Sequence, residues 1–194
     1  LDANIFTETD SRGPKPGNSQ AIALVAALNK IKWQMVLFVP TKFKNKKLVK
    51  SLTNLNVSVV TFNATPVSGF TIFENYMFKK NVGMPSPQTV IDAVIFLTIN
   101  MTYKKINLFG VEQSWLKNLH VTNNNEVRVS LPHFYSGSSD LGRHSSLRSL
   151  SVFLISQADC FASHMRLQKY ARYRGAHILN HTPGSYIDAY DRVL

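Results

Sequence analysis

Residues 87 to 101 are apolar almost all the way round a helix, and this stretch constrains the fold more than any other. Its apolar positions are Val90, Ile91, Ala93, Val94, Ile95, Phe96, Leu97, Ile99 and Met101. A helix of this kind is usually buried between other elements. The chain must therefore supply those elements, and its 194 residues are enough for one well-cored domain.

Strands and helices alternate on both sides of this helix. Apolar runs that predict buried strands lie at 35–40, 57–62, 105–109 and 176–179. Patterns that predict helices cover 18–31, 41–55, 71–80 and 147–174. Alternation on both sides of an Asn-rich turn predicts a β-hairpin over 119–131. This order predicts a single α/β domain over residues 1–194, with a largely parallel sheet flanked by helices.

Ligands of parallel sheets bind beyond the carboxyl ends of the strands. We therefore expect the segment from Gly110 to Trp115 to lie on a functional rim, together with the strand ends at Pro40 and Phe62. Gly110 is expected to make a tight turn. Glu112 could orient a sugar hydroxyl, act as a base or pair with a lysine. Trp115 is either a stacking platform or an anchor for its loop.

The segment "GMPSPQTV" at 83–90 carries the signals of a helix start. Ser86 can cap the helix, and Pro87 suits its first position. The N–H groups of Gln88, Thr89 and Val90 would then be left to bind an anion such as phosphate, helped by the Ser86 and Thr89 hydroxyls. The alternative is an ordinary helix cap without a ligand.

Two residues just before a serine-rich segment are candidates for catalysis. A general base at His133, close to Tyr135, would be accessible to substrate and could be covered by the segment that follows. His177 and His181 lie four apart, but no third ligand is near them in the sequence, so no metal site is predicted. Neither a glycine-rich nucleotide motif, nor a nucleophile elbow, nor an Asp-x-Asp pair occurs.

Cys160 and His164 fall within the last predicted helix. Cys160 is expected to be a buried structural thiol, and His164 a partly buried structural residue. One cysteine fits a reducing compartment. No stretch approaches the roughly 18 apolar residues of a spanning helix. The expected location is the cytoplasm, with peripheral contact at the inner face of the membrane.

The chain is strongly basic, with 22 Lys and Arg against 11 Asp and Glu and a formal charge of +11. This balance favours anionic partners, which include nucleic acid, a nucleotide-linked substrate and an acidic lipid surface. The lysines at 42–50 could rest near anionic lipid, although such a run more often forms a solvated face. Nucleic acid is the less favoured partner, because no recognised nucleic-acid motif is present.

Three segments occur in a recognisable order: "MPSPQTVIDAVIFLTINMTYKKINLFGVEQSW", "HFY" and "YARYRGAHILNHTPGSYIDAY". Over residues 83–190 the chain resembles a bacterial glycosyltransferase-type domain of surface-polysaccharide and flagellin-glycosylation loci. It is more distantly similar to the small bacterial sialyltransferases that use a CMP-activated donor. The resemblance implies a Rossmann-like fold and an inverting, metal-independent glycosyl transfer from a nucleotide sugar in lipopolysaccharide or capsule biosynthesis.

The resemblance also implies roles for individual residues. His133 matches the base that deprotonates the acceptor hydroxyl. The donor-binding positions that it implies are Ser86, Gln88, Thr89, Gly110, Glu112, Ser114 and Trp115. Ser114 and Trp115 stand where the related enzymes have a tyrosine that stabilises the departing phosphate, so Tyr135 is the substitute candidate. The glycine-rich nucleotide loop that opens such enzymes is missing, and the chain is expected to be the C-terminal portion of a longer one.

Two hypotheses for function follow from the sequence. The first is a sialyltransferase-like enzyme that needs no cofactor beyond its nucleotide-sugar donor and acts on a glycan acceptor. The alternative is a non-catalytic basic module that binds nucleic acid or another polyanion, for which the charge of +11 is the argument.

Overall fold

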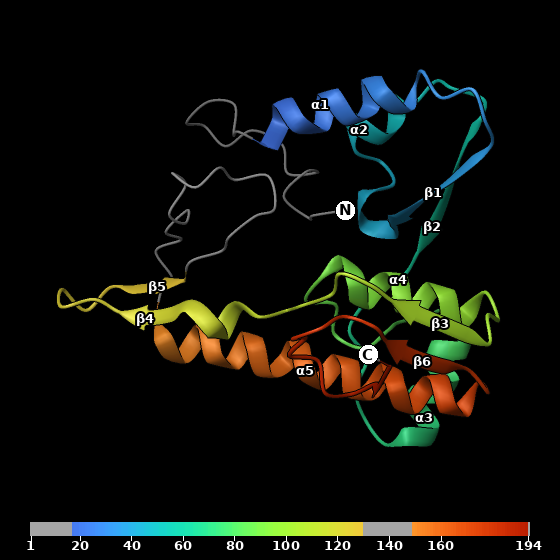
Figure 1. Ribbon diagram of the computed structural model, residues 1–194. Helices are drawn as coiled ribbons and strands as arrows, with labels where there is room; N and C mark the ends of the chain where they lie inside the picture. Colours follow the sequence, from blue (N-terminus) through green and yellow to red (C-terminus); the bar gives the residue numbers. More distant parts are fainter. Residues whose placement is uncertain (1–16, 130–148, 194) are drawn as a thin grey trace. The chain divides into compact units, whose positions relative to one another are not determined.

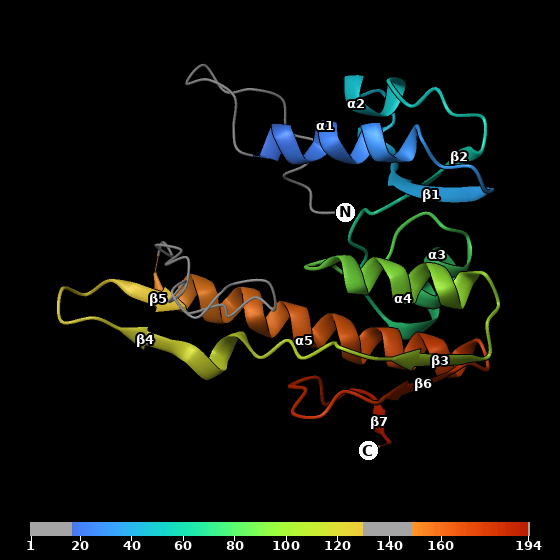
Figure 2. The same cartoon turned by 45° about the horizontal axis from the view of Figure 1, so that its top comes forward.

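The computed structural model describes residues 17–129 and 149–193 (Figures 1 and 2). His133 and Tyr135 lie outside these described residues. The chain divides between Ala93 and Val94 into two compact units. Each unit is described by itself below, and the expectation of a single domain stays a prediction.

The first unit is built around two parallel strands. It contains α1 (Gly17–Leu28), β1 (Met35–Pro40), the 3-10 turn η2 (Thr41–Phe43), α2 (Lys47–Lys50), β2 (Val57–Phe62) and α3 (Thr71–Lys79). β1 pairs with β2 from Met35 opposite Val57 to Pro40 opposite Phe62, and α1 lies beside α2 (Figure 1). The Asn54 side chain donates to the carbonyls of Leu28 at 2.9 Å and Ile31 at 2.8 Å, which ties the end of α1 to the entry of β2.

The helix predicted over 41–55 is wrong, because the chain forms only η2 and the single turn α2 there. Lys42, Lys46 and Lys50 are spaced four apart, so one continuous helix would stack like charges on one face. The segment after α2 is held in another way. The Asn29 side chain accepts from the backbone N–H of Thr53 at 3.0 Å, across 24 residues.

α4 (Val90–Asn100) begins in the first unit and continues into the second. Its buried residues are Asp92, Ile95, Phe96 and Ile99. Burial of this apolar helix is therefore confirmed for one face, whereas Val94 on another face is half exposed.

The second unit holds the other parallel pair. After α4 come β3 (Lys105–Leu108), η3 (Trp115–Asn118), β4 (Leu119–Val121), β5 (Val127–Val129), α5 (Leu150–Tyr173), β6 (His177–Asn180) and β7 (Asp191–Arg192). The strand order is β3-β6-β7, and both pairings are parallel. β4 and β5 form the predicted antiparallel hairpin. β7 was not predicted.

The mixed α/β class with mostly parallel strands is confirmed, and the Rossmann-like arrangement stays a prediction. The described strands do not join into one sheet, because β1 and β2 pair only with each other. Pro40 and Phe62 therefore belong to a different sheet from the strand that precedes Gly110. The expectation that these three strand ends lie along the edge of one sheet is therefore wrong.

The core of the second unit lies between α5 and one face of its sheet. The strands bury alternate residues, Ile106 and Leu108 in β3 and Ile178 and Asn180 in β6. The buried residues of α5 are Cys160, Ser163, His164, Leu167, Gln168, Tyr170 and Ala171.

The helix predicted over 147–174 is confirmed as α5, but its buried face does not follow its apolar residues. Leu150, Leu154 and Met165 are 37%, 42% and 46% exposed, whereas the polar His164 is fully buried. A pattern drawn only through apolar residues misses this face, because hydrogen bonds to both ring nitrogens compensate for the burial of His164. Within residues 17–129 and 149–193, no helix combines the length and apolarity that crossing a bilayer requires.

We predict that Phe96→Ala lowers the free energy of unfolding of the second unit by about 3–5 kcal/mol. Phe96 is 1% exposed, and its ring lies 6.0 Å from that of Tyr170. Denaturant titration in a Trp33→Phe background would report the change through Trp115, the one tryptophan then left.

Phe109→Ala is the matched control, since Phe109 is 70% exposed. We expect this control to change the unfolding free energy by less than about 1 kcal/mol. Equal losses for the two variants would contradict the core described here.

Candidate ligand-binding rim

The carboxyl ends of β3 and β6 lie side by side, since Leu108 is the register partner of Asn180. The loops that follow therefore leave the sheet at the same edge, where parallel sheets bind ligands. We call these loops, residues 109–115 and 181–188, the β3–β6 rim.

Hydrogen bonds join the two loops of the rim directly. The Val111 N–H donates to the Thr182 hydroxyl at 3.0 Å, and the Ser185 hydroxyl donates to the Val111 carbonyl at 2.7 Å. The Tyr186 N–H donates to the Glu112 carbonyl at 2.8 Å. The loop after β3 is thereby fixed against the loop after β6 on both sides of Glu112.

The buried side chain of Asn180 forms hydrogen bonds with two residues of the loop after β6. The Asn180 side chain accepts from the Thr182 N–H at 3.0 Å and donates to the Ser185 hydroxyl at 2.9 Å. All three residues are at most 4% exposed. Sequence reasoning missed them, although the turn-rich "NHTPGS" directly after a strand was the signal that could have found them.

Gly110 makes the turn that was predicted for it. Its φ is +67°, a left-handed conformation that side chains disfavour. A Cβ atom would meet nothing within 4 Å, so the backbone conformation and not the available space calls for glycine.

Glu112 is exposed on the rim. Among the described residues no ion pair joins it to a lysine, so the pairing interpretation finds no support. Its carbonyl accepts from the Tyr186 N–H, and a ligand could contact the side chain of this exposed residue. The next residue, Gln113, has a φ of +43°, which is uncommon for a residue other than glycine.

Gln113 is held in this conformation by two residues one turn apart on α5. Its side-chain oxygen accepts from Cys160 Sγ at 3.4 Å and from His164 Nε2 at 3.0 Å. Because that oxygen can only accept, His164 carries its proton on Nε2, and its Nδ1 accepts from the Tyr190 hydroxyl at 2.9 Å. We call these four residues the His164 network.

Burial lowers the pKa of His164 to about 4, and the opposing effect of the Asp188 charge is smaller. His164 is therefore neutral at pH 7, in agreement with the single proton that the network assigns to it. The expectation that Cys160 is buried is confirmed, whereas His164, which was expected to be partly buried, is fully buried. Their role in holding Gln113 was not foreseen, although their spacing of four places both on one helix face.

Ser114 and Trp115 follow on the same loop and are both half buried. Trp115 opens η3, and the Ser114 carbonyl accepts from the Lys117 N–H at 3.0 Å. A half-buried indole suits both an anchor and a stacking platform, so that alternative remains open.

The predicted anion site at 86–90 meets a carboxylate. In the first unit, Asp92 accepts through Oδ2 from the N–H groups of Gln88 at 3.1 Å and Thr89 at 2.7 Å, and from the Thr89 hydroxyl at 3.0 Å. The helix consequently begins at Val90 and not at Pro87. The expectation that these N–H groups are left for an anion is wrong for Gln88 and Thr89, because Asp92 already provides the negative charge.

Ser86 accepts from the Gln88 side chain at 3.1 Å. The donor-binding roles of Ser86, Gln88 and Thr89 stay predictions. Burial raises the pKa of Asp92 to about 6, against the opposite effect of its hydrogen bonds from Thr89 and Gln88.

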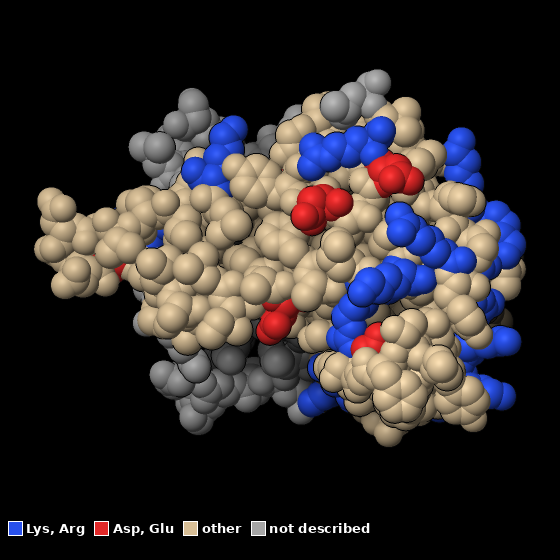
Figure 3. Space-filling model, turned by 90° about the horizontal axis from the view of Figure 1, so that it is seen from below, with Lys and Arg blue, Asp and Glu red and all other residues tan. Residues whose placement is uncertain are grey.

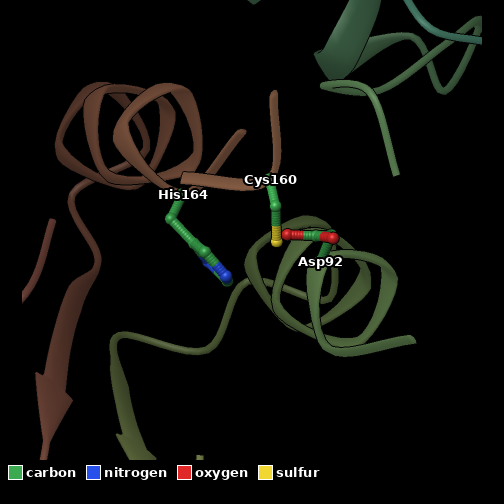
Figure 4. A group of neighbouring side chains, drawn as sticks. All are labelled: Asp92, Cys160 and His164. Atoms are coloured by element: carbon green, nitrogen blue, oxygen red, sulfur yellow. The ribbon is translucent and has the colours of Figure 1, made fainter. Parts of the chain in front are cut away.

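Figure 4 shows the side chains of Asp92 on α4 and of Cys160 and His164 on α5, all of which are of types that can bind a metal ion. Both ring nitrogens of His164 are in hydrogen bonds, as is one oxygen of Asp92. We assign no metal to these residues. The other candidate pair is also engaged, since His181 Nε2 lies 3.0 Å from Asn107 Oδ1 and its ring stacks on Phe109.

We predict that the stability of the second unit falls as the pH drops from about 6.5 to about 4, and that His164→Gln removes this dependence. A histidine whose pKa is lowered by folding stabilises the protein above its unfolded pKa and loses that contribution as the pH falls toward the folded value. The shift to about 4 corresponds to roughly 3 kcal/mol. Urea titrations at a series of pH values measure it. A slope that survives in His164→Gln but disappears in His181→Gln would contradict the assignment.

Asp92 should give the opposite dependence. Its pKa is raised by folding, so its contribution is fully present below about pH 4 and is lost as the pH rises through about 6. We expect Asp92→Asn to be more stable than the parent at pH 7, by up to about 3 kcal/mol, and to match it more closely at pH 4. Thermal unfolding followed by circular dichroism tests this, and a variant less stable at pH 7 than at pH 4, relative to the parent, would refute it.

Comparison of the chain with protein-family models, with curated proteins and with solved structures finds no match. The function proposed below therefore rests on the residues and contacts described above, and on the resemblance carried by the three sequence segments.

Proposed function

We propose that the chain is a glycosyltransferase-type domain, sialyltransferase-like, that transfers a sugar from a nucleotide-sugar donor to a surface-glycan acceptor. The observation that carries the proposal is the β3–β6 rim. There the exposed Glu112 lies on one of two loops that hydrogen bonds join at the carboxyl ends of parallel strands. The reaction would invert the anomeric centre and use no metal, as the resemblance implies.

Glu112 is the residue of the rim to which we assign donor binding. A carboxylate accepts hydrogen bonds from neighbouring hydroxyls, such as those of a ribose or a sugar ring. The Glu112 backbone is fixed through Tyr186, and the adjacent Gln113 through the His164 network. The backbone that carries the carboxylate is therefore ordered before a ligand arrives, which reduces the ordering that binding requires.

The proposed transfer step involves residues outside the described part of the chain. His133 would take the proton of the acceptor hydroxyl as its oxygen attacks the anomeric carbon of the donor. The bond from that carbon to the phosphate oxygen breaks, and the nucleotide leaves with the bonding electrons. Tyr135 would donate a hydrogen bond to the departing phosphate. Both roles come from the resemblance.

The remaining donor-binding positions have different support. Gly110, Ser114 and Trp115 share the rim loop with Glu112, and Trp115 could stack on a base or a sugar face. Ser86, Gln88 and Thr89 lie in the first unit and are assigned to the donor by the resemblance alone. We propose the cytoplasm, at the inner face of the membrane, as the place where the domain meets its acceptor.

One observation favours the alternative of a basic polyanion-binding module. Residues 17–93 contain nine lysines against two acidic residues, Glu74 and Asp92. Such a module would bind a generic oligonucleotide with a strong dependence on salt and would show no preference for a nucleotide sugar.

Calorimetric titration of the full chain with CMP, UMP and GMP tests the proposal. We expect one nucleotide to bind, and Glu112→Gln to weaken its nucleotide sugar about tenfold or more, the loss of a charge-assisted hydrogen bond. Glu126→Gln is the matched control, because Glu126 is an exposed glutamate that pairs with Arg128 in the hairpin. No nucleotide binding at about 1 mM, together with salt-sensitive binding of an oligonucleotide, would favour the alternative.

His133→Ala should abolish transfer to a glycan acceptor while nucleotide binding and the circular dichroism spectrum stay unchanged. The base removes a proton only during the transfer step, so its loss affects turnover and not donor affinity. Turnover at the parent rate in His133→Ala would remove this residue as the base.

A further inference from the structure

α3 directs large apolar side chains to solvent. Ile72 is 80% exposed, Phe70 71%, Tyr76 59% and Phe73 39%, whereas Phe78 on the other side of the helix is 1% exposed. Apolar side chains therefore lie on two sides of this helix. Phe78 is buried against the protein, and the larger apolar group is exposed to solvent.

The spacing gathers these side chains on one face. Ile72, Tyr76, Lys79 and Lys80 follow one another at i, i+4, i+7 and i+8, and Phe73 lies beside them. The Phe70 ring precedes the helix and lies 5.7 Å from the Phe73 ring. We call these six residues the α3 face.

A contiguous apolar patch of this kind marks an interaction site more often than a scattered exposed leucine does. The nearest acidic residue, Glu74, does not belong to the face. Its Oε1 accepts from the Gly69 N–H at 3.0 Å, which fixes the turn at the start of the helix. The α3 face is therefore made of aromatic, aliphatic and cationic groups only.

The charge of the first unit indicates which kind of partner would bind the α3 face. Its described residues hold nine lysines and no arginine, and of its two acidic residues Asp92 is fully buried. Figure 3 shows Lys and Arg side chains mostly on one side of the face that it draws, with some Asp and Glu side chains beside them. A surface that presents aromatic rings next to lysines complements a bilayer whose headgroups are anionic.

We propose that the α3 face docks on an anionic phospholipid bilayer. Phe70, Ile72, Phe73 and Tyr76 insert at the level of the headgroups, where aromatic side chains are favoured. Lys79 and Lys80 extend their ammonium groups to the lipid phosphates. The nine residues of α3 lie in the plane of the interface and do not cross it. This docking does not depend on the proposed glycosyl transfer.

Co-sedimentation of the full chain with phosphatidylcholine vesicles, with and without phosphatidylglycerol, tests the proposal. We expect sedimentation with the anionic vesicles only. Lys79→Gln with Lys80→Gln should weaken it about thirtyfold, and Ile72→Ser with Tyr76→Ser at least about tenfold. Leu55→Ser is the matched control for the second pair, because Leu55 is 95% exposed in the same unit. Lys42→Gln with Lys44→Gln is the control for the first pair and should weaken sedimentation less than that pair does, whereas Leu55→Ser should sediment like the parent.

Circular dichroism and thermal unfolding establish that the variants are folded, as expected for side chains that project into solvent. Sedimentation that is absent with anionic vesicles, or that the α3 variants leave unchanged, overturns the proposal. Self-association without lipid that Ile72→Ser with Tyr76→Ser abolishes also overturns it, because the face would then join two copies of the chain. Binding of nucleotide by a chain that does not sediment refutes the docking alone and leaves the proposed function standing.

Discussion

The parallel pairing of β3 with β6 is the constraint on which the candidate site depends. It brings two loops that are about 70 residues apart in the chain to one sheet edge, as the hydrogen bond from Val111 to Thr182 shows. Asn180 then uses its buried amide to shape the second loop, so that Ser185 reaches the Val111 carbonyl. Buried polar groups are costly unless they are satisfied, and satisfied networks specify one geometry. The loop that carries the exposed Glu112 is thus held through Asn180, Thr182 and Ser185, which are at most 4% exposed.

The His164 network supplies a second set of hydrogen bonds to the loop after β3, from side chains of α5. Gln113 adopts an uncommon backbone conformation, and the side chains of Cys160 and His164 both engage its amide oxygen. A neutral imidazole is required for this arrangement, and burial supplies it by lowering the pKa of His164. His164, whose pKa burial lowers, thus holds a loop in shape. A perturbed pKa is often a sign of catalysis, but here the hydrogen bonds give it a positioning role.

The sequence predicted much of the local structure, because its periodic signals are strong. The strands at 35–40 and 57–62, the hairpin and α3 agree closely with the prediction. Long-range pairing could not be predicted in the same way, since nothing local in β1 says whether its partner is β2 alone or a larger sheet. Helix starts were misplaced where a side chain competes with the backbone, as Asp92 does by accepting from Gln88 and Thr89.

Part of the candidate site could be predicted, because some of its residues directly follow a strand. Gly110 and Glu112 were found because they follow a strand, and their position on a sheet edge is general to parallel sheets. Asn180, Thr182, Ser185 and Gln113 were missed, because their importance lies in contacts between distant segments. His133 and Tyr135 lie outside the described residues, and their roles stay predictions.

We propose that the β3–β6 rim is where this chain binds its ligand. An amide chemical-shift map of the isotope-labelled chain, recorded while a cytidine nucleotide is added, tests that claim residue by residue. We expect the largest shifts on Val111, Glu112, Thr182 and Tyr186, the residues whose backbone groups or hydroxyls join the two loops. Shifts confined to other residues, with these four amides unmoved at saturation, would contradict it.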